Sequence, residues 1–144
     1  MSLTVVTGPP CSGKTSWVDL HAGPADVVID LDRIAHAMTS PAAGEHDHGP
    51  IVYRVAQRAR WAAITEALRH IDAADVYVIH TQPSAQAREK YEAHNARIIT
   101  LDPGRDVVLE RCKRMRGPEA LKTAERWYAT RLAGVPLRQA SRAW

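Results

Sequence analysis

The residues with the clearest chemical meaning lie at positions 8–15, which read Gly-Pro-Pro-Cys-Ser-Gly-Lys-Thr. This spacing fits G-x-x-x-x-G-K-[ST], a pattern in which main-chain N–H groups hold phosphate. Gly13 lets the backbone approach an anion closely, and the N–H groups of Gly13, Lys14 and Thr15 can converge where a helix begins. We therefore expect a phosphate-binding loop and not an ordinary turn.

Each polar residue of this loop has an expected role. Lys14 is expected to reach the β- and γ-phosphates of a nucleotide, and the Thr15 hydroxyl to bind Mg²⁺, which prefers oxygen ligands. Cys11 lies near a helix N-terminus and a lysine, so it is either a nucleophile or, as we prefer, a tolerated loop position, because no base stands beside it in the sequence. The loop residues expected to bind nucleotide are Gly8, Cys11, Ser12, Gly13, Lys14, Thr15 and Ser16.

Short β-branched runs alternate with segments of helical period around this loop. They predict strands over residues 3–7, 27–31, 76–79 and 97–101, and helices over 14–21, 32–38, 51–71, 84–94, 107–116 and 119–133. Strands separated by helices imply right-handed crossovers and a parallel sheet. We therefore predict a single α/β domain over residues 1–144, with three layers, a parallel sheet of four or five strands and helices on both faces.

The carboxyl ends of such strands form the usual binding edge of the sheet, and Gly8, Asp30 and His80 all fall there. Asp32 is predicted to be the N-cap of the second helix. Trp61 is either a core residue, which we expect, or a stacking platform. The apolar stripe of the long third helix is predicted to comprise Val52, Val55, Ala56, Ala59, Ala63, Ala67 and Ile71.

Composition restricts the class of protein. The chain has 144 residues and two cysteines, Cys11 and Cys112, without C-x-x-C spacing, so both thiols are expected to be reduced. No apolar run approaches the roughly 20 residues of a membrane-spanning helix, and we expect a cytoplasmic protein. The loop sequence Glu45-His46-Asp47-His48 could bind metal, but exposure to solvent is the simpler interpretation.

Positive charge is concentrated at the C-terminal end. Residues 103–144 carry 10 Lys and Arg against 4 Asp and Glu, whereas residues 1–102 carry 9 against 12. Residues 103–118 are a candidate basic lid segment, and residues 134–144 are expected to be loosely held. Such a block could bind the phosphates of a nucleotide or a nucleic acid, or simply form a solvated helix face.

The rest of the sequence narrows the kind of phosphate-loop protein. A signalling GTPase needs an N-K-x-D segment, but the only asparagine, Asn95, is followed by Ala96 and Arg97. A ring ATPase usually needs a longer core and an added helical domain. A small kinase therefore fits best.

Residues 7–17, Thr-Gly-Pro-Pro-Cys-Ser-Gly-Lys-Thr-Ser-Trp, resemble the start of the phage polynucleotide 5'-kinase domain. The likeness continues through 29–33 (Ile-Asp-Leu-Asp-Arg), 78–82 (Val-Ile-His-Thr-Gln) and 109–117 (Leu-Glu-Arg-Cys-Lys-Arg-Met-Arg-Gly). The resemblance implies a P-loop kinase fold with a helical lid, the cofactors ATP and Mg²⁺, and a nucleic-acid 5'-hydroxyl as acceptor.

The same resemblance implies roles for individual residues. Asp32 matches the general base that takes the acceptor proton, although Asp30, two residues earlier, could hold that role instead. Arg116 matches a lid arginine directly, whereas Arg111 or Arg114 would match only with a shift in register.

One position departs from that family. His80 stands where the family has an aspartate, so it either contacts the substrate or is a structural side chain. Arg54, Arg58 and Arg60 could grip a phosphate on the acceptor. The residues expected to bind the acceptor are Asp30, Arg33, Arg54, His80, Thr81 and Gln82.

Three functions remain open from the sequence. The first is a kinase of nucleic-acid 5' ends, and the second is a kinase of a nucleoside, a nucleotide or another small molecule. The third is a nucleotide-binding protein with little or no phosphate transfer.

Overall fold

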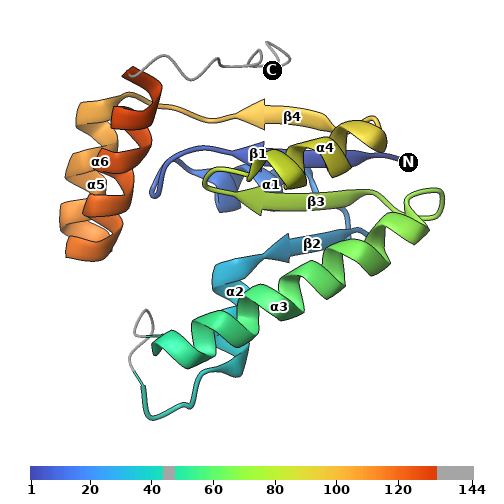
Figure 1. Ribbon diagram of the computed structural model, residues 1–144, viewed down its shortest axis with the longest axis horizontal. Coiled ribbons are helices and arrows are strands. Elements are labelled where there is room, and N and C mark those ends of the chain that lie inside the picture. The colour runs from blue at the N-terminus through green and yellow to red at the C-terminus, as the bar shows by residue number, and fades with distance from the viewer. Residues whose placement is uncertain (44–47, 133–144) are drawn as a thin grey trace.

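Strands and helices alternate along the chain in the computed structural model, which describes residues 1–43 and 48–132 (Figure 1). The strands are β1 (Leu3–Thr7), β2 (Val27–Asp30), β3 (Val76–His80) and β4 (Arg97–Thr100). The helices are α1 (Lys14–His21), α2 (Leu31–Met38), α3 (Pro50–Ala67), α4 (Ala85–Ala93), α5 (Arg105–Met115) and α6 (Pro118–Leu132), with a 3₁₀ turn, η1 (Leu68–His70), after α3.

The four strands form one parallel sheet in the order β2-β3-β1-β4. Thr7 at the end of β1 lies opposite His80 on one side and Thr100 on the other, and Asp30 lies opposite Ile79. All four carboxyl ends therefore meet at one edge. The connection from β1 leads toward one side of the sheet and that from β3 toward the other, so the loop after β1 lies at a topological switch point.

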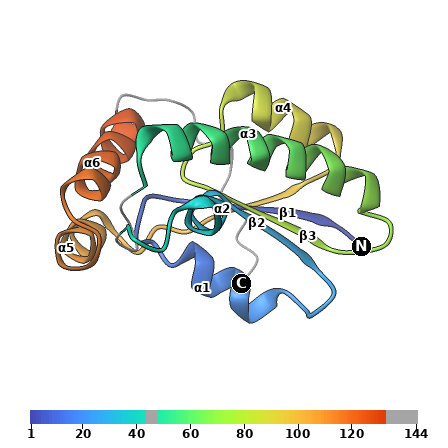
Figure 2. The same cartoon turned by 90° about the horizontal axis from the view of Figure 1, so that it is seen from below.

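Helices cover both faces of the sheet, as Figure 2 shows: α3 and α4 lie on one face and α1 on the other. Alternate strand residues supply the two cores, because successive side chains of a strand point to opposite faces. Val5, Val78 and Ile29 pack with Ile64 and Tyr91 on the α3–α4 side. Val6, Ile79, Ile99 and Leu101 pack with Val18 of α1 on the other. The predicted α/β class, parallel sheet and helices on both faces are confirmed.

Helices α5 and α6 form a hairpin beyond the carboxyl ends of the strands (Figure 1). Among the described residues, two hydrogen bonds join α6 to the segments that directly follow β3 and β4. Trp127 Nε1 donates to the Thr81 carbonyl at 3.1 Å, and the Tyr128 hydroxyl donates to Asp102 Oδ1 at 2.6 Å. The hairpin therefore lies at the carboxyl edge of the sheet.

The start of α2 differs from the sequence prediction. Strand β2 ends at Asp30, and Asp30 Oδ1 accepts a hydrogen bond from Asp32 N at 3.1 Å, so Asp30 is the N-cap. The prediction that Asp32 caps this helix is wrong, because the helix begins at Leu31 and Asp32 lies inside its first turn. The side chain of Asp32 therefore does not cap the helix.

The apolar stripe of α3 also differs from the prediction. The fully buried residues of the helix are Ala56, Ile64 and Ala67. Val55 is 51% exposed, because at about 100° per residue it lies half a turn around the helix from Ile64. Trp61 is 39% exposed, so the expectation that it belongs to the core is wrong.

Two sequence expectations concern residues that the structure does not describe. Glu45, His46 and Asp47 of the possible metal-binding loop lie outside the described residues, as does the segment 134–144. Among the described residues, no helix combines the length and apolar character needed to cross a lipid bilayer.

Candidate active site

The loop between β1 and α1 is set by the glycine at its first position. Gly8 has φ of 150°, and a Cβ there would lie 2.3 Å from the Leu101 carbonyl oxygen and 2.7 Å from Ser12 Oγ. Since Leu101 N bonds to the Thr7 carbonyl, the main chain on either side of Gly8 is fixed by the sheet. Only glycine fits between these two strand ends, and this requirement starts the turn.

The loop ends on the first turn of α1. Gly13 is the N-cap with φ of 92°, and the first helical hydrogen bond runs from Trp17 N to the Gly13 carbonyl at 2.9 Å. No side chain in the described part of the chain caps this helix end. The N–H groups of the first turn, including those of Lys14 and Thr15, are therefore available to an anion at the positive end of the helix.

The Lys14 ammonium group lies within the loop that precedes it. Its Nζ donates to the carbonyl oxygens of Gly8 at 2.9 Å and Pro9 at 2.6 Å, and it lies 3.5 Å from Ser12 Oγ. Burial lowers the pKa of Lys14 to about 8, against the opposing effect of the nearby carboxylates of Asp30 and Asp32. Desolvation is the larger effect here, and it makes the ammonium group ready to bind an anion.

Asp30 and Thr15 lie side by side in the candidate site. The Thr15 hydroxyl donates to Asp30 Oδ2 at 3.4 Å, a long hydrogen bond, while the other carboxylate oxygen caps α2. Burial, and then the negative charge of Asp32, raise the pKa of Asp30. A hydroxyl and a carboxylate side by side are the oxygen donors that suit Mg²⁺, so these residues fit the expected metal.

Asp32 and Arg116 bring the sheet edge and the helical hairpin together. Arg116 Nη2 lies 3.3 Å from Asp32 Oδ2, and the two side chains are 33% and 53% exposed. An ion pair this exposed contributes at most about 1 kcal/mol to stability. Its importance is positional, because it holds a guanidinium group and a partly exposed carboxylate on the Lys14 side of the sheet edge.

The other candidate arginines differ in their contacts. Arg111 Nη1 donates to the Cys11 carbonyl at 3.3 Å, so this arginine also reaches the loop from α5. Arg114 is exposed, and among the described residues it forms no hydrogen bond or ion pair with the loop. Of the two arginines that would need a shift in register, only Arg111 is at the site.

His80 lies in the core and not at the phosphate loop. It is 6% exposed, and its Nε2 is hydrogen-bonded to the Tyr91 hydroxyl of α4. Burial, and then the charge of Arg60, lower its pKa to about 3, so the imidazole is neutral. Because His80 shares a strand face with Val78, it points to the α3–α4 side, which supports the structural interpretation of this residue.

The remaining predicted acceptor residues are dispersed. Arg33 pairs with Asp19 of α1 at 2.7 Å on the surface. Thr81 offers its carbonyl to Gly8 N and to Trp127 Nε1, while Gln82 is exposed. Thr81 is therefore part of the framework that joins β3, the loop and α6.

Helix α3 contributes Arg60, one of the three arginines expected to be able to grip an acceptor phosphate, and Tyr53, which the sequence analysis did not name. Arg60 Nη2 donates to the Ile79 carbonyl at 2.8 Å at the end of β3, and Tyr53 lies near enough to Asp32 for that charge, after burial, to raise its pKa. Burial lowers the pKa of Arg60, and the charges of Asp30 and Asp32 are among those that oppose this shift. The spacing of seven residues, which places Tyr53 and Arg60 on one helix face, is the signal that could have identified them.

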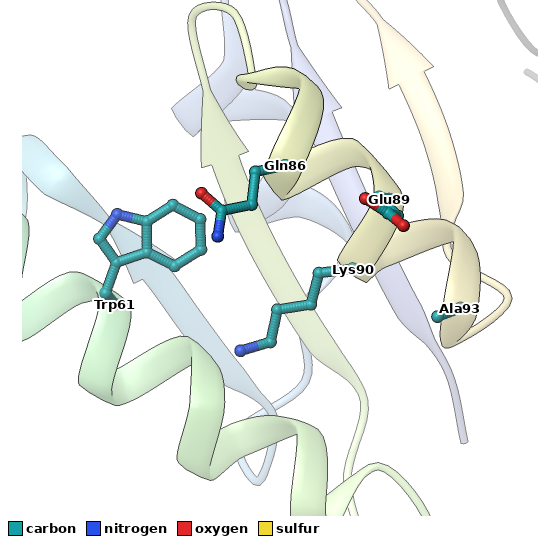
Figure 3. A pocket seen from close by; sticks show the side chains of 5 residues that line it. All are labelled: Trp61, Gln86, Glu89, Lys90 and Ala93. Carbon is teal, nitrogen blue, oxygen red and sulfur yellow. The ribbon is translucent and has the colours of Figure 1, made fainter.

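A groove of about 510 Å³ lies between α3 and α4 on the outer surface of the helical layer. Figure 3 shows Trp61 of α3 facing Gln86 and Lys90 of α4 across it, and Glu89 and Ala93 complete its lining. Lys90 Nζ donates to Thr65 Oγ1 at 2.9 Å and so joins the two helices. The half-exposed indole of Trp61 thus has space beside it.

Comparison with known proteins adds no family to these observations: no family model and no curated protein matches the sequence. Among the described residues, no group of three or more His, Cys, Asp and Glu side chains could hold a metal ion. The candidate site thus stands on the loop and the charged residues around it.

Proposed function

We propose that this protein is an ATP- and Mg²⁺-dependent phosphotransferase that moves the γ-phosphate of ATP to a nucleic-acid 5'-hydroxyl. In this proposal the chain is a P-loop kinase that resembles the phage polynucleotide 5'-kinase domain, with the α5–α6 hairpin as its lid. The observation that carries the proposal is the convergence of Lys14, Thr15, Asp30, Asp32 and Arg116 at one edge of the sheet, from four separate elements.

Each group has a task in phosphate transfer. The amides at the start of α1 and the Lys14 ammonium group bind the phosphates of ATP. Thr15 and Asp30 would hold Mg²⁺, which would supply positive charge against the phosphate oxygens. Arg116 and Arg111 act from the hairpin, where a fixed positive charge stabilises the negative charge that shifts during transfer.

Asp32 is the better general base of the two carboxylates. It is 53% exposed and paired with Arg116, whereas Asp30 is buried and already accepts hydrogen bonds from Thr15 and from Asp32 N. The acceptor oxygen forms a bond to the γ-phosphorus as the bond from that phosphorus to the bridging oxygen of ADP breaks. The acceptor proton passes to the Asp32 carboxylate, and ADP leaves with the electron pair.

A nucleic-acid acceptor is favoured by the side chains on α3. Arg54, Arg58 and Trp61 lie within about 60° of one another around the helix, and the groove beside Trp61 is lined by Lys90. Neither arginine makes an ion pair with a described residue. Unpaired cations beside an exposed aromatic ring suit a single strand, because cations bind its phosphates and an aromatic side chain stacks on its bases.

The test is transfer of labelled γ-phosphate to a 5'-hydroxyl oligonucleotide, run beside a panel of nucleosides, nucleotides and other metabolites. We expect label on the oligonucleotide, and we expect Asp32→Asn to lower kcat by about 10²- to 10⁴-fold with little change in nucleotide affinity. Asp72→Asn, a change at an exposed carboxylate outside the site, is the matched control.

Other outcomes would separate the alternatives. Label on a small molecule alone would identify a metabolite kinase, and bound ATP that stays unchanged with every acceptor would identify a nucleotide-binding protein. Equal rates for the Asp32→Asn and Asp72→Asn variants would remove Asp32 from the chemistry.

A further inference from the structure

The only two cysteines of the chain, 101 positions apart in the sequence, lie in contact. Cys112 Sγ is 3.4 Å from Cys11 Sγ, and it lies 3.7 Å from the Pro10 carbonyl oxygen. Cys11 belongs to the candidate phosphate loop and Cys112 to the middle of α5. The contact therefore joins the loop to the helical hairpin at the point where the two meet.

We propose that Cys11 and Cys112 are a modification site, at which a peroxide generates a disulfide that fastens α5 to the phosphate loop and stops phosphate transfer. Formation of the bond needs only the two thiols and the peroxide, whatever the function of the protein. Its effect on catalysis rests on the proposed function.

The reaction has two balanced steps. The Cys11 thiolate attacks one oxygen of hydrogen peroxide, the O–O bond breaks, and the products are a sulfenic acid at Cys11 and hydroxide. Cys112 sulfur then attacks the Cys11 sulfur, the S–O bond breaks, and the hydroxyl group takes up the Cys112 proton and leaves as water. Peroxide is the two-electron oxidant, and each sulfur is oxidised once.

Exposure decides the order of these steps. Cys11 is half-buried and reachable, whereas Cys112 is fully buried against Ala124, Trp127 and Tyr128 in the core of the hairpin. Burial, and then the Cys11 thiol, raise the pKa of Cys112 to about 12, so Cys112 stays protonated until its neighbour is oxidised. Cys11 is thus the residue that meets the oxidant and Cys112 the one that resolves it.

The geometry needs only a small movement. A disulfide has an S–S length of about 2.0 Å, so the sulfurs must approach by roughly 1.4 Å. The backbone of Cys11 lies in the left-handed region, with φ of 61°, and is therefore already strained. A larger backbone movement at Cys11 would add to that strain. Arg111, next to Cys112 in sequence, already donates to the Cys11 carbonyl, and Arg116 lies one turn further along α5. A covalent bond here would hold both arginines in one position relative to the loop.

The test uses the full chain treated with hydrogen peroxide and then with a thiol reductant. We expect the intact mass to fall by about 2 Da, as two hydrogens are lost, and unreduced digests to contain a peptide linking Cys11 to Cys112. We expect kcat for transfer to fall at least tenfold and to return after reduction.

Variants make the result specific. Cys112→Val keeps the buried volume filled, and Cys112→Ala is a second form in case the first is poorly folded; neither residue change touches the phosphate-binding groups. Both should show no mass loss of 2 Da and no linked peptide. Transfer by untreated Cys112→Val should match that of the untreated wild type.

Two results would overturn the proposal. One is a wild-type chain whose Cys11 is oxidised to sulfenic or sulfinic acid without a linked peptide, and the other is a linked chain that transfers phosphate at the rate of the reduced one. Failure of the proposed function would be seen separately, as absence of transfer by the reduced wild type, while mass and peptide maps still report on the bond.

Discussion

Two glycines of the candidate phosphate loop are required for different physical reasons. There is no space for a side chain at Gly8, since a Cβ would lie 2.3 Å from the Leu101 carbonyl oxygen. Gly13 has open space around it but a φ of 92°, a conformation that other residues rarely adopt. Both positions are glycine in the sequence pattern, but a side chain would cause a steric clash at Gly8 and backbone strain at Gly13.

Substitution with alanine should separate these two causes. We expect Gly8→Ala to destabilise folding by several kcal/mol, because the clash is with main chain on a neighbouring strand end. Gly13→Ala should cost about 1–3 kcal/mol of strain and mainly weaken nucleotide binding. Denaturant unfolding of both variants measures this difference, and equal loss of stability would contradict the reading of Gly8.

Protonation of Lys14 should control nucleotide affinity. In the folded chain its pKa is lowered to about 8 from 10.5, so the unfolded chain binds more protons between these values. Burying the charged ammonium group therefore lowers the free energy of unfolding below pH 8. This loss of stability becomes smaller as the pH rises from 8 toward 10.5. A bound phosphate favours the charged ammonium group, so binding above pH 8 must take up a proton.

The affinity for nucleotide should be nearly constant below pH 8 and fall by up to about tenfold per pH unit above it. Calorimetric titrations at pH 7 and pH 9, in buffers of different ionisation enthalpy, would measure the proton uptake. Lys14→Arg is the control, because arginine stays charged at both pH values. An affinity of the wild type that does not change with pH would contradict this role of Lys14.

At the scale of elements, the start of α2 gives two carboxylates different partners. Asp30 ends β2 on the strand face that looks toward α1, so it meets Thr15 and caps its own helix. Asp32, inside the helix, projects toward Arg116, the residue that follows α5. The two residues have the same chemistry and lie two positions apart, but the change from strand to helix between them gives each a different neighbour.

Helix α3 should extend the acceptor site outward. Trp61→Ala is expected to weaken binding of an oligonucleotide of about 12 nucleotides by roughly 1–3 kcal/mol, through loss of stacking on a base. Binding of a single nucleotide acceptor should change little, because it is too short to reach the groove. Fluorescence anisotropy with a labelled oligonucleotide gives the comparison.

Leu20→Ala, an exposed apolar residue on α1 at the opposite face, is the matched control. Equal oligonucleotide affinity of the Trp61→Ala and Leu20→Ala variants would exclude the groove from nucleic-acid binding. The kinase proposal would be untouched by that result, since the groove is not part of the transfer site.

At the scale of the whole molecule, the sheet order accounts for the site. Strand β3 lies between β1 and β2, so the chain must cross from β1 over β3 to reach β2, and β4 then joins the other side of β1. The loop after β1 is left in the middle of the carboxyl edge. Asp30 at the end of β2 lies on one side of it and Leu101 after β4 on the other. The α5–α6 hairpin lies beyond that edge (Figure 1).

Much of this fold could be predicted from the sequence because its signals are local. The runs at 3–7 and 76–79, rich in β-branched residues, form strands whose side chains are mostly buried. The loop between residues 8 and 13 carries its glycines where the backbone needs them. The rotation of α3 could not be predicted, because Val55 and Ala56 are both apolar and only packing on the sheet selects Ala56. The same uncertainty applied to Trp61.

The sequence by itself determined the order of strands and helices, the parallel connection between them and the loop with its lysine, because each depends on neighbours a few residues apart. Tertiary structure alone decided that His80 bonds to Tyr91, that Arg116 and not Arg114 meets Asp32, and that Cys11 touches Cys112. These pairs are joined by packing between distant elements, and a side chain's type gives no information on which distant element will lie beside it.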